Sequence, residues 1–213
     1  MSIDYQLEGW ELLVAELELI GEPAGDDNLG ALRHATSETA RRDLDLSTLS
    51  TQPTVAAMRA LFRAAGTDPT RYRPSSEALL RRILKGDDIP RIHPFVDLNN
   101  CLSAALAVPC CVMAEGSFEG PFVLRSGEEG ESYDSLRGPF NLAGRPLLVD
   151  RQGPCDAPIT GSKRVMVTAE TSCCTLIAYL PQAALSIDAA SEQLDALLAH
   201  DQVADSVRRS PSD

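Results

Sequence analysis

Residues 71–109 read RYRPSSEALLRRILKGDDIPRIHPFVDLNNCLSAALAVP, and they carry most of what the sequence says about fold and function. Pro74 cannot continue a preceding helix, and Ser75 is a suitable N-cap. The apolar residues that follow repeat at helical spacing until Gly86, a residue that commonly ends helices. The pattern therefore predicts a short helix that begins at Ser75, followed by a turn.

A second helical pattern follows the turn that Pro90 and Pro94 fix. Three polar side chains, Asp97, Asn99 and Asn100, gather near its start. The first turn of a helix exposes unpaired backbone N–H groups and the positive end of the helix dipole. A polar cluster in this position, next to a basic segment, predicts a site for a small anionic or polar ligand.

The composition of the chain is that of one globular domain. Its 213 residues are 44% hydrophobic, which is enough to bury a sizeable core. No apolar run of about 18 residues is present, and no basic segment followed by an apolar one begins the chain. We therefore predict a cytoplasmic location without membrane contact. The formal net charge of −12 argues against nonspecific nucleic-acid binding over the whole surface.

The segment 59–93 is basic within this acidic chain. It holds eight Lys and Arg residues against four Asp and Glu residues, a local charge of +4 (8 − 4). Two interpretations remain open: a solvated face with local ion pairs, or a contact surface for RNA or a nucleotide. The candidate RNA contacts are Arg71, Arg73, Arg81, Arg82, Lys85 and Arg91.

The part of the chain before residue 109 is mainly helical in pattern. Residues 11–20 alternate as in a β-strand, and a turn-rich break follows over 21–30. Residues 31–43 predict a helix, as do residues 53–66, where a proline stands in the first turn. The inward positions that we predict for these helices are Leu32, Ala35, Thr36 and Thr39 in the first, and Val55, Met58, Leu61 and Phe62 in the second.

After residue 109 the pattern changes to short apolar runs broken by Gly and Pro, which predict strands. These runs are residues 110–114, 122–124, 147–149, 165–167 and 173–180. The segments 125–146 and 150–163 are predicted as long loops, and 187–207 as a C-terminal helix that frays into a polar tail. Helices mainly in the first half and strands in the second predict an α+β fold.

No motif for metal binding, covalent catalysis or a cofactor stands out. The six cysteines include two adjacent pairs and lack the C-x-x-C spacing of zinc sites, so we predict buried reduced thiols. His34 and His200 lie in polar helical patterns, and His93 lies near the polar cluster without a serine motif beside it. We assign no triad, no metal and no cofactor.

The order of motifs resembles the B3/B4 domain of the bacterial phenylalanyl-tRNA synthetase beta subunit, and more closely the free-standing proteins built on that domain. The matching pieces are YRPSSEALLRRILKG at 72–86, IPRIHPFVDLNN at 89–100, Pro109, LLVD at 147–150 and VTAET at 167–171. The resemblance implies a three-layer α+β domain that contains a β-sandwich. In the synthetase this domain is the editing module, which hydrolyses tyrosine wrongly attached to phenylalanine tRNA with a positioned water.

The resemblance also implies a pocket, whose residues are Asp97, Asn99, Asn100, Pro109 and Cys111. The family's residues are kept at Asp97, Asn100 and Pro109. Asn99 stands where the family has Thr, and Cys111 stands where it has His. We therefore expect this wall of the pocket to be reshaped.

The glutamate with which the family's last strand reads the tyrosine hydroxyl falls at Ile177 or Ala178 in this chain. An apolar side chain cannot hydrogen-bond that hydroxyl. A site without such a partner loses most of the selectivity between tyrosine and phenylalanine. The resemblance thus implies a related pocket with another ligand preference.

Three functions remain open on the sequence. The first is a free-standing domain that binds tRNA or aminoacyl-tRNA ends and hydrolyses mischarged aminoacyl-tRNA, without aminoacylation activity of its own. The second is a non-enzymatic module for an amino-acid-like or nucleotide-like ligand, and the third is an interaction protein with a vestigial pocket. We expect residues 1–181 to form the B3/B4-like domain, with 182–213 packed on it.

Overall fold

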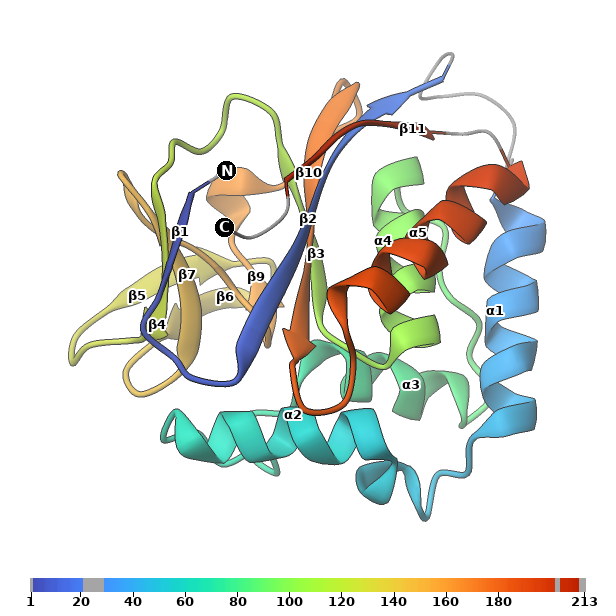
Figure 1. Cartoon of the computed structure of the whole chain (residues 1–213), viewed down its shortest axis with the longest axis horizontal. Coiled ribbons are helices and arrows are strands. Elements are labelled where there is room, and N and C mark those ends of the chain that lie inside the picture. Colours follow the sequence, from blue (N-terminus) through green and yellow to red (C-terminus); the bar gives the residue numbers. More distant parts are fainter. Residues whose placement is uncertain (1, 21–28, 202–203, 211–213) are drawn as a thin grey trace.

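The fold consists of three layers: a layer of helices, a four-stranded sheet and a five-stranded sheet (Figure 1). The structure, a computed structural model, describes residues 2–20, 29–201 and 204–210, with side chains up to residue 199. The predicted turn over residues 21–30 lies largely outside these residues. The two sheets face each other as a β-sandwich, and the helices cover the outer face of the four-stranded sheet (Figure 1). The predicted α+β fold with a β-sandwich is confirmed.

The middle layer is fully antiparallel. In spatial order its strands are β11 (Ala204–Ser210), β2 (Trp10–Leu19), β10 (Cys173–Pro181) and β3 (Cys110–Ala114). The strands predicted over 11–20, 110–114 and 173–180 are therefore confirmed. β10 is buried from Cys174 onward because helices cover one of its faces and the second sheet covers the other. A strand buried on both faces reads as a continuous apolar run, as this one does.

The outer sheet begins with a parallel pair and continues antiparallel. Its strands in spatial order are β1 (Ile3–Tyr5), β4 (Phe122–Ser126), β7 (Pro146–Asp150), β8 (Gly153–Ala157) and β9 (Thr160–Gly161). A hairpin of β5 (Ser132–Ser135) and β6 (Gly138–Asn141) extends from its edge. The strands predicted over 122–124 and 147–149 are confirmed.

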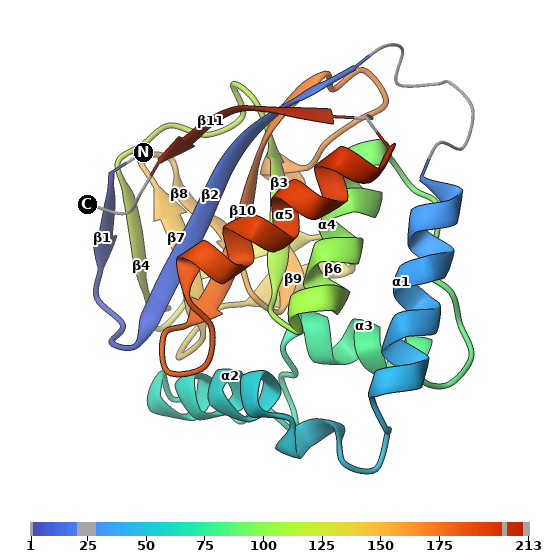
Figure 2. The same cartoon turned by 45° about the vertical axis from the view of Figure 1, so that its right-hand side comes forward.

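The helices divide into a layer and an end cap. The layer contains α1 (Gly30–Asp43), α3 (Ser75–Ile83), α4 (Pro94–Leu106) and α5 (Ile187–Asp201). α2 (Pro53–Ala64) follows a short 3-10 turn, η1 (Leu49–Thr51), and lies across one end of the sheets (Figure 2). There Phe62 stacks on Trp10 with ring centroids 5.9 Å apart. The predicted inward positions of α2 are confirmed for Val55, Met58 and Phe62, which are all buried.

The prediction for the inward face of α1 was wrong at two positions. Ala35 and Thr39 are exposed, whereas Arg33 and Ser37 are buried beside Leu32. The Ser37 hydroxyl donates to the carbonyl of Arg33 over 2.9 Å and accepts from the backbone N–H of Ile89 over 3.3 Å. Polar side chains with partners thus take the inward positions that the apolar pattern had given to Ala and Thr.

The two predicted long loops are largely strands. The segment 125–146 contains the β5–β6 hairpin, and 150–163 contains β8 and β9. A cation–π contact of 3.8 Å between Arg145 and Tyr72 holds the hairpin region to the helical half, together with a 2.7 Å bond from Thr67 Oγ1 to the Gly144 carbonyl. Sequence patterning missed these strands because their residues are mostly polar or glycine. Whether such a segment forms a strand depends on pairing with neighbouring strands, which local patterning does not show.

Three further boundaries differ from the predictions. Pro74, rather than Ser75, occupies the N-cap of α3, and the backbone N–H of Ser75 donates to the Pro158 carbonyl over 3.0 Å. The apolar run 165–167 is no strand: a 3-10 turn, η2 (Lys163–Val165), stands there, capped by Ser162 Oγ. The predicted helix 187–207 ends at Asp201.

Residues 204–210 form β11 and not a frayed helix end, because β2 offers them an unpaired edge. α5 packs against α4 and β2. The division of the chain at residue 181 stays a prediction. Among the described residues, no helix combines the length and apolar content that a membrane crossing needs.

Candidate functional site

The five predicted pocket residues lie on both sides of the four-stranded sheet. α4, which carries Asp97, Asn99 and Asn100, packs on the helical side (Figure 1). Cys111 pairs with Ile177 in the sheet, and its side chain is close enough to Asp156 of β8 in the facing sheet for that carboxyl group to help raise the pKa of the thiol. The structure therefore separates Cys111 from the α4 residues, and the sheet itself lies between them.

Asp97 is a structural anchor in this arrangement. Its carboxylate receives a 2.7 Å ion pair from Arg33 of α1 and a 2.8 Å hydrogen bond from the backbone N–H of Ile92. Both partners of the ion pair are buried. Burial raises the pKa of Asp97, while the Ile92 and Arg33 bonds favour its ionised form. Asp97 thus joins α1, α4 and the segment before α4.

His93 is the N-cap of α4. Its Nδ1 accepts from the backbone N–H of Phe95 over 3.2 Å, so Nδ1 carries no proton in this state. Burial lowers the pKa of His93, which favours the neutral ring that this cap requires. The histidine near the predicted polar cluster therefore caps the start of α4.

The other predicted pocket residues have mixed surroundings. Asn99 is buried, and its Oδ1 has no hydrogen-bond partner among the described residues. Asn100 is half-buried. Pro109 is buried at the start of β3, and its carbonyl accepts from the backbone N–H of Tyr179 over 2.9 Å. Of this set, only Cys111 reaches the space between the sheets.

That space contains a polar cluster of Cys111, Asp156 and Tyr179. The Tyr179 hydroxyl donates to Asp156 Oδ2 over 2.6 Å, and the Cys111 thiol lies near the same carboxyl group. Tyr179 stands two residues after Ile177 on β10 and therefore on the same face. A carboxylate thus occupies the region opposite the apolar Ile177, supplied by a different strand.

Burial dominates the protonation of this cluster. It raises the pKa of Asp156 to about 7, although the Tyr179 hydroxyl and the nearby Cys111 thiol favour the ionised form. It also raises the pKa of the Cys111 thiol and of the Tyr179 hydroxyl, so both groups stay protonated at neutral pH. A buried carboxyl group that changes charge near neutrality can hold or release a proton, but Asp156 is only 2% exposed.

Sequence reasoning missed Asp156 and Tyr179 for identifiable reasons. Asp156 falls within the segment 150–163 that was predicted as a loop, so its inward position on a strand was not considered. Tyr179 lies in a run that is buried on both faces, where alternation gives no signal.

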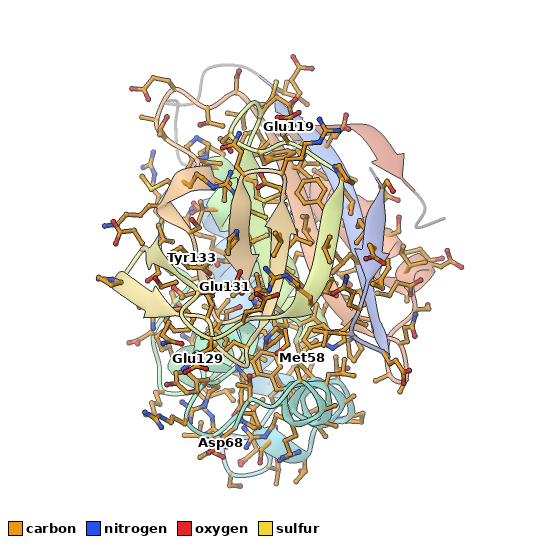
Figure 3. All side chains as sticks on the ribbon, turned by 90° about the vertical axis from the view of Figure 1, so that its left-hand side faces the viewer. Met58, Asp68, Glu119, Glu129, Glu131 and Tyr133 are labelled. Atoms are coloured by element: carbon orange, nitrogen blue, oxygen red, sulfur yellow. The ribbon has the colours of Figure 1, made fainter. Side chains whose placement is uncertain are left out.

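An open pocket of about 460 Å³ lies between the two sheets at the end away from α2. β2 and β10 contribute Val14, Glu16 and Thr175 to its lining, the segment that leads into β4 contributes Glu115 and Phe118, and β4 contributes Phe122. Arg151 at the rim binds Glu119 over 2.8 Å. Figure 3 shows Glu119 at this end of the sandwich and Asp68 at the opposite end, near α2.

Part of the predicted RNA-contact set is engaged in ion pairs. Glu77 of α3 is fully buried and is approached by Arg59 at 2.8 Å, Arg81 at 2.9 Å and Arg73 at 3.4 Å. This group holds α2, α3 and the connection between them together. The remaining members of the set, Arg71, Arg82, Lys85 and Arg91, are exposed.

The basic turn at 161–164 is likewise structural. Arg164 forms a two-pronged ion pair with the buried Asp150, at 2.9 Å and 3.1 Å, and also donates to the Ser117 carbonyl. All six cysteines are free thiols. Within the ranges that the structure covers, no group of three or more His, Cys, Asp and Glu side chains is arranged to hold a metal ion.

The sequence model of the B3/4 domain matches residues 57–196 of this chain, which include α3, α4, the sandwich strands β3 to β10 and most of α5. The chain belongs to the B3/4 domain family. Among solved structures, it is similar to an N-terminal fragment of the phenylalanyl-tRNA synthetase beta subunit from Pyrococcus horikoshii, with 13% identity and a TM-score of 0.49. That alignment covers 99% of this chain and 54% of the fragment, so this B3/4 domain spans about half of it. No curated protein sequence matches the chain.

The buried ion pair between Arg33 and Asp97 gives a first prediction. Replacing Arg33 by Met leaves the Asp97 carboxylate buried without its cation, and we expect a loss of about 3–5 kcal/mol in unfolding free energy. Urea denaturation measures it. Arg42→Met is the matched control on the same helix, because Arg42 pairs with Asp43 in solvent, and we expect it to leave the unfolding free energy close to that of the wild type. Equal effects of the two substitutions would show that the buried pair has no special role.

The pKa of Asp156 gives a second prediction, which concerns stability and pH. Between an unfolded pKa of about 3.9 and the folded value of about 7, the folded protein binds the proton that the unfolded chain releases. The free energy of unfolding should therefore fall as pH rises from about 4 to 7, by up to about 4 kcal/mol, and level off above that range. In Asp156→Asn this part of the dependence should vanish.

The comparison between the wild type and Asp156→Asn isolates this carboxyl group, since His93 contributes to both proteins alike. Denaturation midpoints measured at half-unit pH steps provide the test. Parallel profiles for the two proteins would show that Asp156 is ionised throughout this range.

Proposed function

We propose that this B3/4 domain binds tRNA or aminoacyl-tRNA. Its sequence motifs resemble those of the editing module of a tRNA synthetase, and its family membership rests on two thirds of the chain. The observation that carries the proposal is a set of exposed basic side chains on an otherwise acidic protein. Arg71, Arg82 and Lys85 are exposed and form no ion pair with another described residue.

These side chains belong to α3 and its flanking segments, next to α2 (Figure 2). The group around Glu77 adds to them, because three arginines surround one carboxylate and leave a surplus of two positive charges. With a net charge of −12, the protein repels a polyanion such as tRNA over most of its surface. A local basic region therefore also determines the side from which tRNA approaches the protein. Phosphate contacts at such a region confer affinity that depends on salt.

The test is tRNA binding by the double variant Arg82→Gln, Lys85→Gln. Neither side chain forms an ion pair within the described part of the chain, so the fold should be unaffected. We expect the affinity to fall about tenfold at low salt, and the slope of log affinity against log salt to decrease by about 1.5, since two phosphate contacts are lost. Filter binding over a salt series measures both quantities.

The double variant Arg137→Gln, Lys163→Gln is the matched control. It removes the same charge from two exposed side chains on the sandwich side of the molecule and should bind as the wild type does. If both double variants weaken binding equally, the affinity reflects overall charge and the α3 region has no special part in it. If the wild type binds no tRNA, the proposal is wrong.

The finer form of the proposal is hydrolysis of mischarged aminoacyl-tRNA. The resemblance supports this, because the editing reaction uses a positioned water and needs no protein nucleophile. We expect release of amino acid from at least one member of a panel of mischarged tRNAs to exceed the buffer control at equal pH. Release at the control rate across the panel, together with intact tRNA binding, would limit the function to binding.

A further inference from the structure

Arg145 is a buried cation to which the described part of the chain supplies no anion. The residue is only 8% exposed. Its Nη1 donates to Asn141 Oδ1 over 2.8 Å and to the Ala143 carbonyl over 3.0 Å, and both acceptors are neutral. Its Nε is buried and has no hydrogen-bond partner among the described residues. Arginines are almost never buried in proteins unless they are paired, so this positive charge calls for an anion from outside the fold.

The surroundings of Arg145 are aromatic and basic. Its guanidinium carbon lies 3.8 Å from the centroid of the Tyr72 ring and 5.4 Å from that of the Phe140 ring. The guanidinium carbon of Arg71 lies 5.2 Å from the centroid of the same Tyr72 ring. One aromatic ring thus holds two like charges, and an anion that contacts both of them would relieve their repulsion.

The acidic side chains of this region leave both arginines without a counter-charge. Asp134 stands on the face of β5 opposite to Tyr133, because neighbouring residues of a strand point to opposite faces. The carboxylate of Asp68 accepts from the backbone N–H of Thr70 over 2.8 Å. Glu129 lies on the same side of the molecule as Tyr133 and forms no ion pair with a described residue (Figure 3).

Both guanidinium groups can be reached from solvent. Arg71 is exposed, and Tyr72 is half-buried. Nη2 of Arg145 has no hydrogen-bond partner within the described ranges, yet it is not enclosed as Nε is, so it remains open to solvent. A ligand at the surface of this cluster can therefore contact Arg71 and Nη2 of Arg145.

We propose that Arg71 and Arg145, held against the Tyr72 ring, bind the phosphate group of a nucleotide. Guanidinium groups are planar forks of N–H donors that match the oxygens of a phosphate. The exposed guanidinium plane of Arg71 and the half-buried ring of Tyr72 also offer a stacking surface, which nucleobases use in single-stranded recognition. Both features together favour a nucleotide over a phosphate on an aliphatic carrier.

This inference deepens the proposed function, since it adds to the exposed side chains of α3 a phosphate contact from the other half of the molecule. Arg71 precedes α3, whereas Arg145 directly precedes β7 of the outer sheet. A phosphate on both would bridge the two halves that the Thr67–Gly144 hydrogen bond already joins. The site can be tested with mononucleotides, without tRNA.

The experiment is calorimetric titration of the full chain with AMP, adenosine and ribose 5-phosphate at neutral pH. We expect AMP to bind at least about tenfold more tightly than adenosine, which has no phosphate. Ribose 5-phosphate should bind at least about fivefold more weakly than AMP, because the stacked base is lost. Equal affinities for AMP and adenosine, or no binding of AMP, would overturn the phosphate site. Equal affinities for AMP and ribose 5-phosphate would contradict a nucleotide as its ligand.

Substitutions locate the binding. Arg71→Gln should weaken AMP binding about tenfold, since it removes one charged donor. The fold should tolerate this change, because Arg71 is exposed and contacts only the Tyr72 ring among the described residues. Arg145→Gln should weaken AMP binding to a similar extent, and if it fails to fold, Arg71→Gln still decides. The matched control is Arg137→Gln, which removes an exposed arginine from the turn of the neighbouring hairpin and should stay within about twofold of the wild type. Wild-type affinity in Arg71→Gln would overturn the proposal.

The outcomes separate this site from the proposed function. AMP binding that depends on Arg71, in a protein that binds no tRNA, supports the phosphate site with a free nucleotide as its ligand and overturns the proposed function. Binding of tRNA without binding of AMP overturns the phosphate site and leaves the proposed function in place. If both bind and Arg71→Gln weakens both, the phosphate belongs to the tRNA.

Discussion

The burial of β10 on both faces is the constraint on which the rest of the structure depends. Helices cover one face of this strand and the second sheet covers the other, so each polar side chain on it needs a partner or an opening. Tyr179 finds its partner in Asp156, a carboxylate from the facing sheet. Thr175 lies instead where the sheets part, at the wall of the pocket. One strand thus provides both a sealed polar cluster and an open polar site.

The fold could be predicted from the sequence where local patterning and burial agree. The apolar stripe of α2 predicts a helix, and the continuous apolar run of β10 predicts a buried strand. Both predictions were confirmed. Patterning failed where a distant partner decides the outcome. Arg33 is buried because Asp97, far along the chain, meets it across two helices. The strands within 125–146 and 150–163 are polar and exist through cross-strand bonds, which no local pattern encodes.

None of the five predicted pocket residues lines the open pocket between the sheets. The sequence marks Asp97, Asn99 and Asn100 as a cluster, yet the first of these is committed to an ion pair with Arg33. Arg59, Arg73 and Arg81 are likewise engaged by one buried glutamate, Glu77. The motifs that identify the family are therefore in large part residues that hold its layers together. The polar groups that line the pocket come from strands whose pairing could not be predicted from the sequence pattern.

The topology of the middle sheet also has a consequence for how the chain can be made. Among the described residues, β2 (Trp10–Leu19) pairs with β10 (Cys173–Pro181) and with β11 (Ala204–Ser210). β2 is therefore far along the chain from its hydrogen-bonding partners, and contacts so distant in sequence make folding slow. During synthesis the apolar face of β2 stays without its sheet until nearly the whole described chain has emerged. Such a nascent chain exposes an unpaired strand, which is the kind of segment that chaperones protect.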